Sequence, residues 1–177
     1  MKEIQIFRKF IELLAKQHQL IKHSKKQCHF SCTVDGAQNK YAATMHYPCV
    51  VLDIGDIEIR GTASQSFVET EYYIFFLDHV KDTGSEKEIV EKLDNMRQVA
   101  LDFLAKMVRC KKDFTQYPWL SRIDVVGTQL QQIVMESPAL YGYCAIMKNS
   151  QAFRDIDCEN VFGIKELFAK EFTQSFE

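Results

Sequence analysis

The stretch FVETEYYIFFLD, residues 67–78, has the strongest strand signal in the chain and decides the fold class. Aromatic and β-branched side chains dominate it, and such side chains suit a pleated, well-packed strand. Because side chains alternate along a strand, large apolar residues fall on both faces. One face carries Val68, Tyr72, Ile74 and Phe76, and the other carries Phe67, Tyr73, Phe75 and Leu77. The stretch therefore predicts a strand within a sheet, ended by the polar run 81–84.

A long helix is predicted directly after this strand. Ser85 is followed three residues later by Glu88, which is the spacing of a capping box. Apolar residues then recur every three or four positions from Ile89 to Val108, including Phe103 and Leu104. Acids in the first turns and bases in the last turn match the helix dipole.

The residues before the central strand predict one helix and several strands. Apolar spacings of three and four indicate an amphipathic helix ending near His23, with the stripe Ile4, Phe7, Phe10, Ile11, Leu14, His18 and Ile21. The period changes to two from Cys28, and Asp35-Gly36 supplies a turn, so we expect a hairpin that returns over residues 41–45. The apolar run 47–53 predicts a strand covered on both faces, with Pro48 at its first residue.

The residues after the long helix predict two more strands. One lies within residues 120–134, with a bulge at Gly127, and the other covers residues 140–147. A polar segment, 148–160, leads to a short C-terminal helix with Ile164, Leu167, Phe168 and Phe172 on its apolar side. The expected fold is α+β, a mostly antiparallel sheet with both helices packed on it, in the order α-β-β-β-α-β-β plus the terminal helix. Residues 1–160 are expected to form one domain and residues 161–177 a helical appendage.

Composition excludes several classes of protein. The 177 residues carry a formal net charge of −2, which gives no general attraction to nucleic acid or to an anionic membrane. No run of about 18 apolar residues suggests a transmembrane helix, and no signal peptide is expected at the N-terminus. The six cysteines lie mostly among apolar neighbours, so we expect reduced thiols in a reducing compartment.

The charge is unevenly distributed along the chain. Residues 1–26 contain seven basic and two acidic side chains, whereas residues 53–95 contain eleven acidic and four basic ones. Two solvated faces would give this pattern, and so would head-to-tail self-association of a basic face with an acidic one. Under the second interpretation the candidate oligomer contacts are Lys9, Lys16, Glu69 and Glu71.

The motifs predict no catalytic, cofactor-binding or metal site. His29 lies between Cys28 and Cys32, but strand alternation points its imidazole away from the two thiols, so an exposed imidazole is expected there. The seven glycines form neither a phosphate-binding loop nor a nucleophile elbow. Asp53, Asp56 and Glu58 are expected in an exposed acidic loop. The basic N-terminal helix is followed by no motif that reads nucleic-acid sequence.

The order of these segments resembles the phage tail terminator and tail-completion family. The resemblance covers about residues 1–160 and lies in the leading helix, the stretches 47–52 and 72–80, the helix 89–108 and the strand 140–146. The C-terminal helix departs from the family pattern. It is open whether that helix docks on a neighbour or is an addition of one lineage.

The resemblance implies a structural role. Such a protein forms a homo-oligomeric ring, often a hexamer, that ends growth of the tail tube and contacts a head-completion protein. It would act in the bacterial cytoplasm during assembly and then belong to the virion tail. The alternative from the residues alone is a small non-enzymatic cytosolic adaptor that works by protein–protein interaction.

Overall fold

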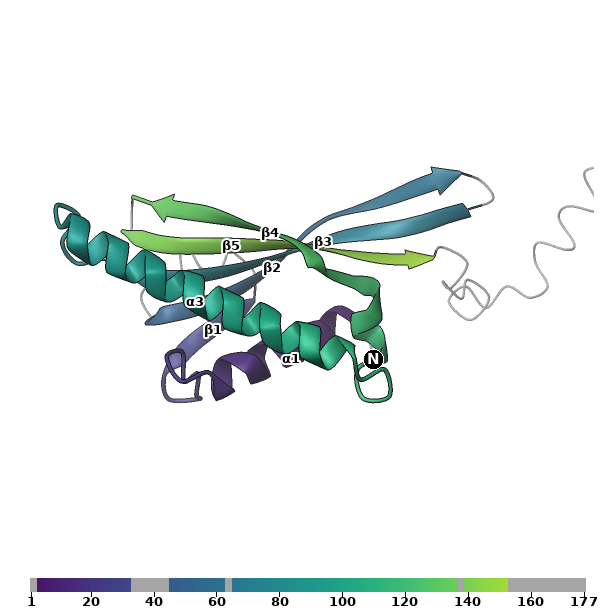
Figure 1. The fold of residues 1–177 in the computed structure, drawn as a ribbon, viewed down its shortest axis with the longest axis horizontal. Helices are drawn as coiled ribbons and strands as arrows, with labels where there is room; N and C mark the ends of the chain where they lie inside the picture. Colours follow the sequence, from purple (N-terminus) through teal and green to yellow (C-terminus); the bar gives the residue numbers. More distant parts are fainter. Residues whose placement is uncertain (1–2, 33–44, 63–64, 137–138, 153–177) are drawn as a thin grey trace, which may run out of the picture.

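A computed structural model describes residues 3–32, 45–62, 65–136 and 139–152 (Figure 1). The elements in chain order are α1 (Glu3–Gln17), β1 (Cys28–Cys32), β2 (Met45–Thr62), β3 (Gln65–His79), α3 (Glu86–Lys111), the 3-10 helix η2 (Pro118–Arg122), β4 (Ile123–Met135) and β5 (Leu140–Ala152). The α+β class is confirmed. The C-terminal helix expected at residues 164–172 lies outside the described residues.

The five described strands form a mixed sheet in the order β1-β2-β3-β5-β4. The β2–β3, β3–β5 and β4–β5 pairs are antiparallel, whereas β1 pairs with β2 in parallel. The return strand of the hairpin expected after Cys28, residues 41–45, lies outside the described residues apart from Met45, which begins β2. A tight turn joins only antiparallel strands, so β1 and β2 are not the two sides of a hairpin.

Both described α-helices cover one face of the sheet (Figure 1). The predicted stripe of α1 is buried there through Phe7, Phe10, Ile11 and Leu14, and Phe103 of α3 is 2% exposed. The Phe103 ring lies edge-on to Phe76 of β3, with centroids 5.2 Å apart. A smaller apolar cluster lies on the other face of the sheet: Met45, Cys49, Val51, Leu77 and Leu140.

The ends of the helices differ from the prediction at one place. α1 ends at Gln17 rather than near His23, and it is followed by a turn at residues 19–21 and by Lys22 with a positive φ of 50°. Ser85 caps α3 as predicted, with its hydroxyl accepting the Glu88 N–H at 3.3 Å. The Glu88 carboxylate, however, accepts from the N–H groups of residues 81 and 82 and not from Ser85.

Three strands continue beyond the helical layer as an arm (Figure 1). We define the arm as residues 54–62 of β2, 65–72 of β3 and 147–152 of β5, which pair with one another on both sides of a bulge in β2. Only the base of the arm, at Ile54, Tyr72 and Met147, still packs in the main core. Two expectations are wrong here. Asp53, Asp56 and Glu58 lie within β2 and not in a loop, and residues 148–152 belong to β5 and not to a polar linker. Charged side chains are compatible with strands whose faces are exposed to water.

Candidate functional site

We call the rest of the described sheet, which α1 and α3 cover on one face, the body; the arm differs from it most in the exposure of that same face. β2 has a bulge between Ile54 and Ile57, after which Ile57 pairs with Thr70 and Ile59 pairs with Val68. Alternation from the buried Tyr72 puts these residues on the side of the sheet that the helices cover in the body. Ile57 is nevertheless 62% exposed and Ile59 is 66% exposed. No described helix extends far enough to cover them.

The opposite face of the arm carries a network of ion pairs. Arg60 contacts Glu58 at 2.5 Å and Glu69 at 3.5 Å. Lys148 of β5 contacts Glu69 at 3.0 Å and Glu71 at 3.8 Å. These pairs link β2, β3 and β5, and because the side chains of both cations, Arg60 and Lys148, are nearly half exposed, each pair contributes little to stability. They offset much of the acidic charge of this face within the chain itself.

Tyr73 marks the boundary between the arm and the body on this face. Its hydroxyl donates to Glu71 at 2.5 Å, and this hydrogen bond raises the pKa of Tyr73 to about 12. The phenol therefore keeps its proton at neutral pH and is not a nucleophile or a base there. Its ring lies against Gly55, where any Cβ would collide with the ring carbons. The glycine in the bulge is thus required by the tyrosine packed over it.

Two shallow hollows adjoin this network. The larger, about 300 Å³, is lined by Glu71, Tyr73, Asp124, Gly127, Gln129, Ile146 and Lys148. The smaller, about 50 Å³, is lined by Asp56, Glu58, Glu69 and Glu71. Within the described ranges, no three His, Cys, Asp or Glu side chains are grouped so that they could hold a metal ion. The chemistry of this face is that of a charged, solvated protein surface.

The structure separates the four predicted oligomer contacts. Lys9 and Lys16 lie on the exposed side of α1, whereas Glu69 and Glu71 lie on the other side of the sheet, in the arm. Lys16 already pairs with Glu12 at 2.6 Å, and the Glu69 side chain is only 12% exposed beside its two cations. Lys9 and Glu71 remain better placed for a charged contact with another molecule than Lys16 and Glu69.

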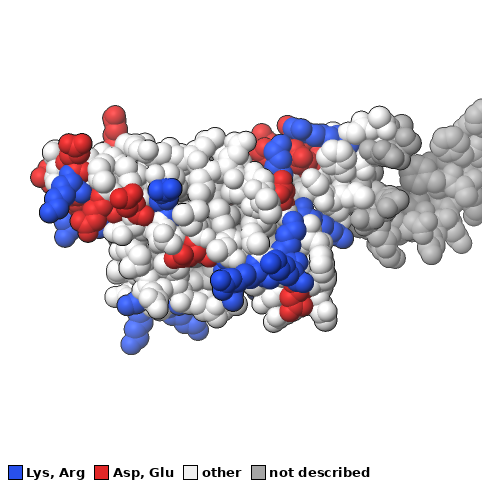
Figure 2. Space-filling view, in the orientation of Figure 1, with Lys and Arg blue, Asp and Glu red and all other residues white. Residues whose placement is uncertain are grey.

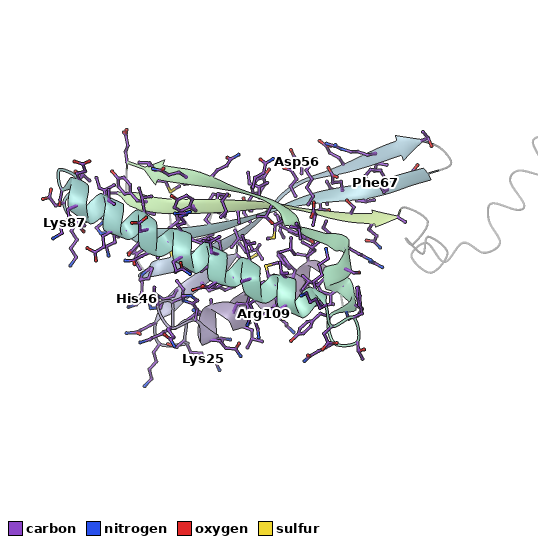
Figure 3. All side chains as sticks on the ribbon, in the orientation of Figure 1. Lys25, His46, Asp56, Phe67, Lys87 and Arg109 are labelled. Atoms are coloured by element: carbon purple, nitrogen blue, oxygen red, sulfur yellow. The ribbon has the colours of Figure 1, made fainter. Side chains whose placement is uncertain are left out.

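The acidic block of residues 53–95 divides into two distant groups. One lies in the arm, and the other lies where α3 begins, at the opposite end of the molecule (Figure 2). Figure 3 shows this separation through Asp56 and Phe67 in the arm and Lys87 near the start of α3. Basic side chains gather over the C-terminal half of α3. The sequence block is therefore not one acidic face, because β3 carries the chain from the arm to the opposite end of the sheet before α3 begins.

The residues around Cys28 correct a second expectation. His29 is 8% exposed, so its imidazole is buried and not solvated. Its Nδ1 lies 2.8 Å from the Pro48 carbonyl, and its backbone N–H donates to His23 Nδ1.

The five described cysteines are free thiols, and burial raises the pKa of Cys144 to about 12. Cys158 lies outside the described residues.

Sequence reasoning missed a second surface, the outer edge of β4. β4 pairs with β5 on one side, and no described strand pairs with its other side. Residues 128–135, TQLQQIVM, contain no charge and no proline, and Val134 is 50% exposed. Edge strands are commonly protected by charges, prolines or bulges, and the one bulge in β4 precedes Gln129. The absence of charge over eight residues was the available signal.

No family model matches the chain, and a search of curated proteins returned no match. Among the described helices, none is both long and apolar enough to cross a membrane.

Proposed function

We propose that this chain is a structural protein of a phage or prophage, a subunit of a homo-oligomeric ring that completes the tail tube and joins it to the head. The resemblance in element order supports the tail assignment. The observation that carries the assembly role is the arm, which extends past the helical layer with Ile57 and Ile59 exposed. Exposed apolar side chains on a projecting sheet are typical of surfaces that another protein covers.

A ring requires a heterologous contact, in which two different surfaces of the same chain meet. The arm and the body are two such surfaces, because one projects and the other does not. The proposal places the subunit in the bacterial cytoplasm during assembly and in the tail of the virion afterwards. Its partners are further copies of itself in a ring, which is often a hexamer in the family that the chain resembles, together with a tail-tube protein and a head-completion protein.

The test combines the purified chain with the tail-tube protein of the phage or prophage that encodes it. Electron microscopy of the tubes is expected to show a ring at one end, and tubes assembled in its presence are expected to stop at a uniform length. Tubes that stay uncapped and keep growing at high concentrations of the chain would overturn the proposal. A strict monomer that binds no tail component would favour the cytosolic adaptor.

Salt dependence separates two kinds of ring contact. A contact through Lys9 and the acidic residues of the arm would weaken between about 0.1 M and 1 M salt, because the Debye length falls from roughly 10 Å to 3 Å. A contact through apolar side chains and backbone hydrogen bonds would persist. The internal pairing of Glu69 with Lys148 and Arg60 favours the second result.

A further inference from the structure

Two edges of the described sheet are open, and they have different chemistry. β1 pairs with β2 only as far as Leu52, so no described strand pairs with the outer edge of β2 along the arm. The outer edge of β4 is open at the other side of the sheet. Open edges present unpaired backbone N–H and C=O groups, which a strand of another chain can use.

We propose that the arm edge of one copy, residues 54–62 of β2, pairs with the β4 edge of the next copy, residues 129–135, so that the sheet continues from subunit to subunit. This inference rests on the proposed ring and names the contact that builds it.

The direction of the strands fits this pairing. Three antiparallel steps, β2 to β3, β3 to β5 and β5 to β4, leave β4 running opposite to β2. A neighbouring copy in the same orientation therefore presents its β2 antiparallel to β4. The same orientation also keeps the helix-covered faces of both copies on one side of the continued sheet.

The side chains on the helix-covered side are complementary. Leu130 packs against the main core, and alternation places Val134 on the same side of β4. Ile57 and Ile59 of the arm lie on the corresponding side of β2. Pairing the edges would bring these apolar side chains together and cover isoleucines that are more than half exposed in the single chain.

On the face of the sheet away from the helices, pairing the arm edge with the β4 edge brings no like charges together. The arm presents Asp56, Glu58 and Arg60 there, whereas β4 presents Gln129, Gln131 and Ile133. Glutamine amides can donate to carboxylates or accept from a guanidinium. Pairing two arms with each other would instead bring together two strands that each carry two acidic side chains and one basic side chain, whereas residues 129–135 of β4 carry none. The uncharged β4 edge is the better partner.

The pairing also requires that neighbouring copies be shifted relative to each other along the strand direction. Residues 129–135 pair with residues 140–146 of β5, which lie level with the body half of β2 and not with the arm. The next copy must therefore be displaced along the strands. A fixed shift of register between strands is what a closed ring of tilted strands needs.

The experiment introduces one lysine into each of the two edges, in separate variants. Ile59→Lys blocks the arm edge and Val134→Lys blocks the β4 edge, and both positions are exposed, so the fold should tolerate lysine. Val90→Lys on α3 is the matched control, since Val90 is also 50% exposed and lies outside both edges. Masses are measured by native mass spectrometry and sedimentation against the 20.6 kDa of one chain.

The wild type and the Val90→Lys control are expected to form the same multimer, and each edge variant alone is expected to stay a monomer. An equimolar mixture of the two edge variants is expected to form a one-to-one dimer that grows no further. Its single contact joins the intact arm of the Val134→Lys chain to the intact β4 of the Ile59→Lys chain.

Other outcomes overturn the inference. Association of Ile59→Lys alone would indicate pairing between two β4 edges, and association of Val134→Lys alone would indicate pairing between two arms. A wild type that stays monomeric at every concentration, or a mixture that forms no dimer, also contradicts the contact. If both edge variants still cap the tail tube as the wild type does, the edge pairing is wrong while the proposed function stands.

Discussion

The body and the arm are two parts of one sheet that share β2, β3 and β5, and they are stabilised in different ways. In the body, α1 and α3 bury Phe76, Ile74 and Val50 to 0% exposure. In the arm, the same face carries isoleucines that stay mostly in water, and the other face carries Arg60 and Lys148 among carboxylates. The difference shows that strand pairing alone extends a sheet, while burial requires a covering layer.

The largest expected contrast is between two apolar truncations. Phe103→Ala in α3 removes a ring that is 2% exposed and should lower the free energy of unfolding by about 3–5 kcal/mol. Ile59→Ala in the arm should change it by less than about 0.5 kcal/mol, because its side chain already contacts water. Urea denaturation of dilute protein measures both. Equal losses would mean that the arm is packed as tightly as the body.

A smaller effect is expected near the C-terminal end of β3, in the body. Asp78 has a side chain that is 7% exposed and accepts from Lys92 Nζ at 2.9 Å. Lys92→Met leaves this carboxylate with the His79 N–H as its remaining donor among the hydrogen bonds described, and should destabilise the fold by roughly 1–3 kcal/mol. Lys87→Met, in an exposed part of the same helix, is the control.

Thermal melts compare the melting temperature of Lys92→Met with that of the control Lys87→Met. A further variant, Asp78→Asn combined with Lys92→Met, should recover part of the loss, because the uncompensated buried charge is gone. An unchanged melting temperature for Lys92→Met would show that this pair adds nothing to the packing of α3 on β3.

The smallest effect concerns the capped start of α3. Hydrogen bonds from the N–H groups of Lys81 and Asp82 lower the pKa of Glu88 below its usual 4.5. The folded-state pKa is thus below the unfolded one, so the stabilisation is complete above about pH 5 and is lost as pH falls through the folded pKa. Glu88→Ala should remove this part of the pH dependence in melts between about pH 3 and 6. A variant that keeps the wild-type profile would contradict the assignment.

The sequence predicted the elements with strong periodicity and failed where several patterns compete. Residues 67–78 and the helix after Ser85 were found because each has one dominant period and clear ends. The continuation of β2 to Thr62 was missed because Gly55, Asp56 and Glu58 are typical of loops. They form a strand because pairing with β3 supplies the backbone hydrogen bonds, and Tyr73 packs over Gly55.

Contacts between distant segments were less predictable. The burial of His29 depends on the Pro48 carbonyl and on His23, which no local pattern brings together. The four charged residues chosen from the sequence lie as two groups on opposite sides of the sheet, and two separate surfaces are what a head-to-tail contact between copies requires. The β4 edge could have been identified from its uncharged run, yet its position at the edge of the sheet depends on the crossed order β3-β5-β4.

The most direct test of the account is hydrogen–deuterium exchange of the intact chain at low and high protein concentration. At low concentration, the amides of residues 54–62 should exchange faster than those of the buried turns of α3, since no described strand or helix covers the outer edge of the arm. At high concentration, exchange should slow in residues 54–62 and 129–135 together and stay unchanged in α3. Exchange that is independent of concentration in both edges, or slowed in only one of them, would contradict the pairing of the arm with β4.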